Sequence, residues 1–193
     1  MHFWEGASTM DVTDAITGRR SIRKYRDAVP SEDDILFVLE AARHAPSWAN
    51  TQCWEFILVT DATLKSRLAE TLPEKNPARP AIEQAPVVIA ACGRKGISGF
   101  FKGSAATDKG DWLLFDLALA LQNLTLAAFS RGLGTVHVGF FDSARAEAIL
   151  KVPDSVAVVE LLPLGFPDGE GRPTPRKGLD EFVFLNAYGQ KRF

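Results

Sequence analysis

Residues 112–129, WLLFDLALALQNLTLAAF, form a stretch that would be apolar on nearly every side of a helix. In a soluble protein such a helix must be covered all round, because exposed apolar surface is unfavourable in water. Asp116, Gln122, Asn123 and Thr125 interrupt the stretch, which is barely long enough to cross a bilayer, so we predict no membrane span. We expect a helix over 111–131, at the centre of the fold or against a second subunit.

Four apolar segments elsewhere in the chain are predicted to be the strands of one sheet: 54–59, 86–92, 135–139 and 156–164. Helices are expected over the intervening segments: 11–18, 32–45, 61–72 and 142–150. Ser31, followed three positions later by Asp34, is typical of a helix N-terminus, and Gly132 is suited to end the long helix in a left-handed conformation. The alternation of helices and strands predicts a layered α/β arrangement.

Composition limits the class of protein. With 193 residues, 46% of them hydrophobic and 24% charged, the chain is expected to form one globular domain over 1–193. A net charge of −2 argues against a dedicated nucleic-acid binder. The N-terminus shows no secretory signal, so we expect a cytoplasmic protein. Cys53 and Cys92 lack the spacing of a zinc or redox site and are expected to be buried free thiols.

Positive charge is concentrated in Gly18–Arg26, GRRSIRKYR, where five of nine residues are basic and none is acidic. Arginine presents a fork of donors that fits phosphate oxygens, and in an extended segment Arg19, Ser21 and Arg23 would share one side. These residues could hold one phosphate; the alternative is a solvated basic turn. Arg176–Lys177 is a second basic spot.

Three loops have compositions suited to a ligand, although each could be an ordinary surface loop. Residues 46–52 are rich in donors and acceptors for a heteroaromatic ring, 73–80 is expected to be an exposed loop, and 93–110, with Phe100 and Phe101, is expected to be a mobile lid. Gly139 would let a ligand approach the backbone closely. His137 has apolar neighbours and is interpreted as packed or cofactor-adjacent, not as a catalytic base.

Three blocks together resemble the nitroreductase family of FMN-dependent oxidoreductases, in family order and spacing: Arg19–Tyr25, Ala45–Phe56, and Gly132–Thr135 with Gly165–Pro167. The resemblance covers Asp11 to Phe184. It implies an α+β fold with a central mixed or antiparallel sheet flanked by helices. It also implies an intertwined homodimer with two FMN sites at the subunit interface and exchanged C-terminal segments.

The resemblance also implies roles for individual residues. Arg19, Arg20, Ser21 and Arg23 would surround the FMN phosphate and ribityl chain, with Arg23 reaching toward the N1/O2 edge of the ring. Pro46, Ser47 and Asn50 would contact the flavin of the partner subunit, and Gln52 would bind the ribityl chain or ring. The backbone at Val138 and Gly139 would face N5, and Arg176 and Lys177 would complete the phosphate clamp. No metal site and no catalytic protein residue is implied.

The implied reaction passes hydride from NADH or NADPH through flavin N5 to a small planar acceptor, such as a nitroaromatic or a quinone, by a ping-pong mechanism. The alternatives are a specialised family member (a dehalogenase, a desaturase or a flavin-fragmenting enzyme), a flavin-binding dimer without turnover, and nucleic-acid binding through 18–26. Two residues depart from the family pattern: many members carry a small residue in place of Trp48 and a proline in place of Cys53. Asn76 and Arg79 are only candidates for ring contacts.

Overall fold

One antiparallel sheet, with the strand order β1-β2-β6-β5, organises residues 10–192, the part of the chain that the computed structural model describes. Its strands are β1 (Trp54–Val59), β2 (Val87–Arg94), β5 (Gly134–Thr135) and β6 (Val156–Gly165). The prediction of four strands in one sheet is confirmed. The apolar run of β2 is buried from Val87 to Gly93, because helices cover both faces of the sheet.

The strand expected over 135–139 is shorter than predicted. Regular pairing with β6 ends at Thr135, and Val138 rejoins β6 only through an isolated bridge to Leu161. On its other side Thr135 forms a parallel bridge to Ser21, and its carbonyl accepts a hydrogen bond from the Ile22 N–H at 2.9 Å. The basic segment therefore occupies the outer edge of β5, and no local sequence pattern carries that information.

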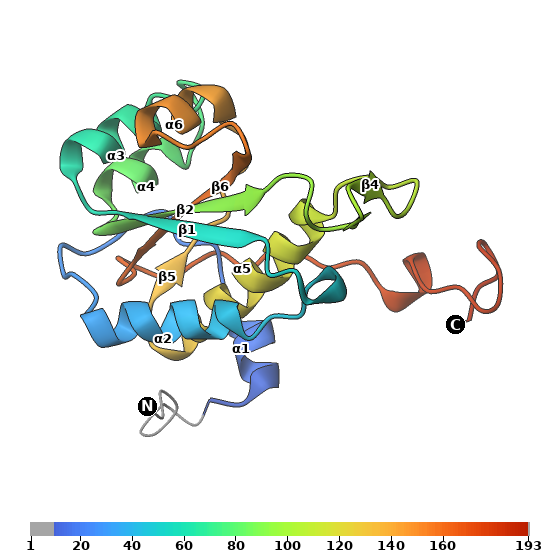
Figure 1. The fold of residues 1–193 in the computed structure, drawn as a ribbon. Helices are drawn as coiled ribbons and strands as arrows, with labels where there is room; N and C mark the ends of the chain where they lie inside the picture. The colour runs from blue at the N-terminus through green and yellow to red at the C-terminus, as the bar shows by residue number, and fades with distance from the viewer. Residues whose placement is uncertain (1–9, 193) are drawn as a thin grey trace.

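Two layers of helices enclose the sheet (Figure 1). Helices α3, α4 and α6 cover one face, and α1, α2 and α5 cover the other. The helical elements are α1 (Val12–Gly18), α2 (Glu32–Arg43), η1 (Trp48–Asn50), α3 (Ala62–Ala69), α4 (Arg79–Gln84), α5 (Leu113–Ser130), α6 (Ser143–Leu150) and η2 (Leu179–Glu181). Each face of the sheet has its own apolar core, so the fold has two cores that share the strands.

Helix α5 is confirmed where the apolar stretch predicted it, and it ends with Gly132 at φ +72°. Within residues 10–192 it is the one helix whose length and composition would suffice to cross a membrane. Its inner side packs Leu117, Leu121 and Leu124 into the core beneath the sheet, whereas Phe115 keeps 54% of its surface exposed. The single chain thus covers only one side of the helix.

The N-terminus of α2 provides a measurable test of local sequence reasoning. Ser31 Oγ accepts a hydrogen bond from the Asp34 N–H at 3.1 Å, and Asp34 Oδ2 accepts one from the Ser31 N–H at 3.3 Å. We expect Ser31→Ala to lower the free energy of unfolding by about 1 kcal/mol, because a helix donor loses its partner. Urea unfolding measures the change. The exposed Ser104→Ala is the control, and an equal loss in both variants would contradict the capping role.

Two regions expected to be loops contain short regular elements. The segment expected to be a loop through Pro80 instead enters α4 at Arg79, with Pro80 in the first turn, where its missing N–H removes no helical hydrogen bond. The segment predicted as a lid contains a hairpin of β3 (Phe100–Phe101) and β4 (Ser104–Ala105). Phe101 is largely exposed at its tip, and the role of this hairpin as a lid stays a prediction.

Candidate functional site

The basic segment is held between β5 and the chain that leaves β6. The Asp168 N–H donates to the Lys24 carbonyl at 3.0 Å. The buried Tyr25 hydroxyl donates to the carbonyl of Ile22 at 2.8 Å, and its burial raises the pKa of this hydroxyl above its ordinary value. Tyr25 therefore anchors the segment to the core, while Arg23 and Arg26 on either side of it are exposed.

A cavity of about 390 Å³ opens beside this segment. Its walls include these predicted phosphate ligands: Arg19, Arg20, Ser21, Arg23 and Arg176. The loop 168–172 also lines the cavity, and its Gly171 lies directly against Arg20: a Cβ there would lie 2.3 Å from Cβ of Arg20. The structure thus brings two basic spots of the sequence, about 150 residues apart, to one cavity.

One basic side chain of the cavity lacks a hydrogen-bond partner within the described chain at a buried nitrogen, although Asp168 and Glu170 also line the walls. Arg19 Nη1 is buried and has no hydrogen-bond partner among residues 10–192. Burial lowers the pKa of Arg19, and the nearby positive charges of Arg176 and Arg20 lower it further. A buried donor without a partner is costly, and an anion would supply both the acceptor and the opposite charge. A phosphate group fits this donor set.

Not every predicted ligand is equally placed. Arg20 Nη1 donates to the Thr17 carbonyl at 2.6 Å, and Arg176 Nη1 donates to Thr174 Oγ1 at 2.6 Å, so each has one guanidinium nitrogen engaged locally. Lys177 follows Arg176 but does not line the cavity. The observed basic wall therefore contains arginines from both spots but not the second member of the C-terminal pair.

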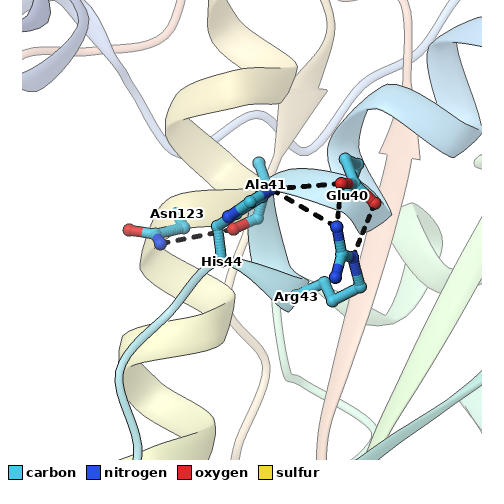
Figure 2. Close-up of polar contacts among 5 residues, drawn as sticks. All are labelled: Glu40, Ala41, Arg43, His44 and Asn123. Atoms are coloured by element: carbon cyan, nitrogen blue, oxygen red, sulfur yellow. Dashed lines mark hydrogen bonds and ion pairs between the residues drawn. The ribbon is translucent and has the colours of Figure 1, made fainter. Parts of the chain in front are cut away.

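The loop that carries Pro46, Ser47, Asn50 and Gln52 starts from a fixed helix end. Figure 2 shows Glu40 contacting Arg43 and His44 at the C-terminus of α2, with a distance of 2.8 Å from Arg43 Nε to Glu40 Oε2. The hydrogen bond from Arg43 lowers the pKa of Glu40. Asn123 of α5 donates to the Ala41 carbonyl at 3.3 Å, which ties the end of α2 to α5.

The loop itself is strained. Ala49, Asn50 and Gln52 have φ values of 45°, 56° and 46°, in the left-handed region that residues other than glycine rarely adopt. Ser47 Oγ accepts a hydrogen bond from the Gln52 N–H at 3.0 Å. Each such conformation costs on the order of 1 kcal/mol and persists only where the surroundings hold it. None of the four predicted ligands in this loop lines the arginine cavity of the same chain.

Asp116 of α5 holds the loop 46–52 in place through hydrogen bonds, a role that the sequence did not indicate. It is fully buried in the first turn of α5. Its carboxylate accepts hydrogen bonds from the Trp48 N–H at 2.8 Å and the Thr51 hydroxyl at 3.2 Å. The available signal is that Asp116 is the single acidic residue of a largely apolar stretch.

The third predicted region lies at the end of β5. Val138 is buried, whereas Gly139 is exposed and a Cβ there would meet nothing within 4 Å, so the backbone is open to a flat ligand. Gly139 lines a separate open cavity of about 480 Å³ with Leu114 and Phe141. Asn76, a candidate ring contact, donates to the carbonyl of Phe140 at 3.3 Å and so lies beside this region.

His137 is not packed, and that part of its interpretation is wrong. Its side chain is 37% exposed, and Nδ1 lies 2.6 Å from Oε1 of Glu160 on β6. The carboxylate is 23 residues away in the chain and was not evident from the sequence. Whether His137 lies beside a cofactor stays a prediction.

The two cysteines are free and buried, as predicted. Burial, aided by the nearby carboxylate of Asp116, raises the pKa of the Cys53 thiol to about 11, and burial raises that of Cys92 to about 12. Both thiols are therefore protonated at neutral pH, which makes them poor nucleophiles.

These pKa values predict a loss of stability at alkaline pH. Unfolded thiols ionise near pH 8.5, whereas the folded ones resist ionisation until about pH 11 or 12, so stability is complete below pH 8.5 and falls as the pH rises toward those values. Between pH 8 and pH 10 we expect the free energy of unfolding to fall by up to about 2 kcal/mol per thiol. Urea unfolding at both pH values measures it, and Cys92→Ala should fall less steeply.

The chain is an α+β protein with an antiparallel sheet between two helical layers, an arginine-lined cavity whose donors suit an anion, and a separate open backbone position at Gly139. Residues 16–166 match the family model described as "Nitroreductase family", and the chain belongs to that family. This confirms the resemblance drawn from the three sequence blocks.

Individual relatives agree. The chain is 35% identical over 171 residues to a protein of Methanothermobacter thermautotrophicus whose name gives NADH dehydrogenase and NAD(P)H nitroreductase as candidate activities; the match covers 86% of this chain and 83% of that one. It is 30% identical over 182 residues to the FMN reductase [NAD(P)H] of Bacillus subtilis, covering 86% and 70%. A nitroreductase family protein of Clostridium novyi NT has a similar structure, with a TM-score of 0.73, 30% identity and coverage of 95% and 97%. The predicted α+β class is confirmed.

Proposed function

We propose that this chain is an FMN-dependent oxidoreductase that takes hydride from NADH or NADPH and delivers it to a small planar acceptor such as a nitroaromatic or a quinone. Its membership of the nitroreductase family makes it an oxidoreductase, and a relative 30% identical to it is an FMN reductase. The observation that carries the proposal is the arginine cavity with the unpartnered buried Nη1 of Arg19, because it demands an anion of the kind that FMN carries.

The residues around the cavity fit the phosphate end of this cofactor. Arg19, Arg20, Ser21, Arg23 and Arg176 would hold it, with Lys177 as a further cation outside the cavity wall. Arginine forks can bind two phosphate oxygens at once, and the Ser21 hydroxyl adds a short-range donor. The inward-facing Arg19 would then gain the opposite charge that its neighbours Arg20 and Arg176 cannot supply.

The bound flavin would supply the redox chemistry: its N5 would take hydride from the nicotinamide and pass it to the acceptor. The chain's own contribution is binding and orientation. The exposed backbone at Gly139, next to Val138, would admit a flat ring, and Arg23 would place positive charge near its N1/O2 edge. Ser47, Asn50 and Gln52 would offer it polar contacts, and Pro46 an apolar one. We propose no protein nucleophile and no metal, because the nicotinamide and the acceptor only need to stack one after the other on the flavin ring.

We propose a homodimer with the flavin at its interface. Within one chain the loop 46–52 does not reach the arginine cavity, so a second subunit would bring its polar groups to the ring. The C-terminal segment extends away from the body (Figure 1) and leaves Phe182 and Leu185 about half exposed. No other described strand pairs with the outer edge of β1, so that edge is also free for a partner.

A cytoplasmic location stays a prediction.

The test is the visible absorption spectrum of the purified protein before and after NADPH or NADH is added without oxygen. We expect an FMN spectrum that bleaches on reduction and recovers when a quinone or nitroaromatic acceptor is added. A flavin that stays oxidised would indicate a different reductant or a flavin-binding dimer without turnover. A reduced flavin that ignores these acceptors would favour a specialised family activity. A protein that cannot take up FMN would contradict the proposal.

A further inference from the structure

The carboxylate of Asp116 joins two segments that the proposed function uses separately. One oxygen, Oδ1, accepts from the Trp48 N–H at 2.8 Å. The other, Oδ2, accepts from the Thr51 hydroxyl at 3.2 Å and from the Ser98 hydroxyl at 2.6 Å. Trp48 and Thr51 belong to the strained loop of predicted ring contacts, whereas Ser98 lies at the base of the β3–β4 hairpin.

This carboxylate depends on both segments at once. It is fully buried, and among residues 10–192 no lysine, arginine or histidine forms an ion pair with it. A buried carboxylate without a cation depends on hydrogen bonds to its oxygens, aided here by its place in the first turn of α5, and the loss of any one donor is costly. The remaining donor, the Cys53 thiol at 3.7 Å, is weak. Neither segment can move away without leaving the buried charge poorly solvated.

Ser98 transmits this constraint to the hairpin. Its backbone carbonyl accepts from the Trp112 N–H at 3.0 Å, one turn before Asp116 on the same helix end. The Trp112 indole N–H donates in turn to Thr107 Oγ1 at 3.1 Å, where the chain leaves the hairpin after β4. Gly99 packs directly on the indole ring, because a Cβ there would lie 2.4 Å from it. The base of the hairpin is therefore fixed to the N-terminus of α5.

We propose that Asp116 is a positioning residue that couples the loop at 47–52 to the hairpin at 98–107, so that the two segments adopt their ligand-competent arrangement together. The loop's strained backbone is held by the same carboxylate that holds the hairpin base. A change that frees one segment will therefore loosen the other. The effect on the flavin rests on the proposed function, whereas the coupling between the two segments does not.

The test uses two variants that each cut one arm of the network. Ser98→Ala removes the hairpin's hydroxyl, and Thr51→Val removes the loop's hydroxyl with little change in shape. Two readouts follow each variant. The first is tryptic cleavage in the FMN-free protein at Lys102, within the hairpin, and at Lys109, just after it. The second is the FMN dissociation constant with the visible circular dichroism of the bound flavin. Ser104→Ala, on the exposed face of β4, is the matched control.

The coupling predicts crossed effects. Thr51→Val should speed cleavage of the hairpin about 3- to 10-fold, although Thr51 lies outside it, because the buried carboxylate loses one of the hydrogen bonds that hold it in place. Ser98→Ala should weaken FMN binding by a similar factor and change the flavin's circular dichroism, although Ser98 lies outside the loop. Asp116→Asn should show both effects, and Ser104→Ala neither.

The outcomes separate this inference from the proposed function. If each single variant affects only its own segment, the two segments are anchored independently and the inference is wrong. If the unaltered protein binds no FMN, the proposed function fails, and the cleavage of the hairpin in Thr51→Val still decides whether the coupling exists. If Asp116→Asn does not fold, the two single-hydroxyl variants carry the test.

Discussion

Arg19→Ala is expected to weaken FMN binding about 100-fold, and Arg19→Ala combined with Arg23→Ala is expected to leave the purified protein without flavin. A hydrogen bond to a charged group contributes about 1.5–3 kcal/mol, and each 1.4 kcal/mol is a factor of ten in affinity. Arg19 provides a buried donor with no other partner among the described residues. The dissociation constant, measured by quenching of flavin fluorescence, reports the change.

The same substitution should leave the flavin-free protein at least as stable as the original. Arg19 is crowded by Arg176 and Arg20, and burial together with these charges already lowers its pKa. Its removal relieves a like-charge contact in the absence of an anion, so the melting temperature of the FMN-free variant should not fall. A loss of FMN together with an equal loss of stability would indicate a structural role for Arg19 instead.

Arg26→Ala is the control for this prediction, because Arg26 belongs to the same basic segment but is exposed and does not line the cavity. Its FMN affinity should stay within about twofold of the original, and the Arg19 and Arg26 variants have the same net charge. If the Arg19 and Arg23 double variant keeps stoichiometric FMN, the phosphate is bound elsewhere.

The sequence predicted most of what depends on neighbours along the chain. The apolar run of β2, the Ser31 cap of α2 and the apolar stretch of α5 each follow from spacings of a few residues, and the structure confirms all three. The grouping of Arg19 to Arg23 was also visible, because the four predicted ligands lie within five positions. The cofactor roles of these residues stay predictions until FMN binding is measured.

What the sequence did not indicate depends on contacts between distant residues. The Asp116 carboxylate meets Trp48 across 68 positions, and His137 meets Glu160 on a neighbouring strand, so neither pair leaves a local pattern. The same holds for β5, whose pairing ends where Ser21 reaches Thr135 from the N-terminal part of the chain. Arg176 was visible in the sequence as part of a second basic spot, but its role at the phosphate was implied only by the family resemblance, and its position at the arginine cavity is a result of the fold.

Phe115→Asp combined with Phe182→Asp is expected to convert a dimer into monomers. These side chains are 54% and 55% exposed in the single chain and lie on different elements, α5 and the C-terminal segment. Burial of a phenylalanine is worth about 1.5–3 kcal/mol, and in a twofold symmetric interface each side chain is buried twice. The dimer dissociation constant should therefore rise by about 10⁴-fold or more. Sedimentation equilibrium at micromolar concentration measures it.

Val29→Asp places the same charge on another exposed apolar position, in the loop before α2, and should leave the dimer intact. A double variant that remains dimeric would show that these two side chains do not form the interface.

The flavin affinity of the monomer shows whether the two subunits share the flavin site. The arginine cavity is complete within one chain, whereas the loop 46–52 lies outside it. If the two subunits share the site, the monomer should lose its affinity for FMN but keep weak binding of inorganic phosphate. Tight FMN binding by the monomer would instead place the whole flavin within one subunit.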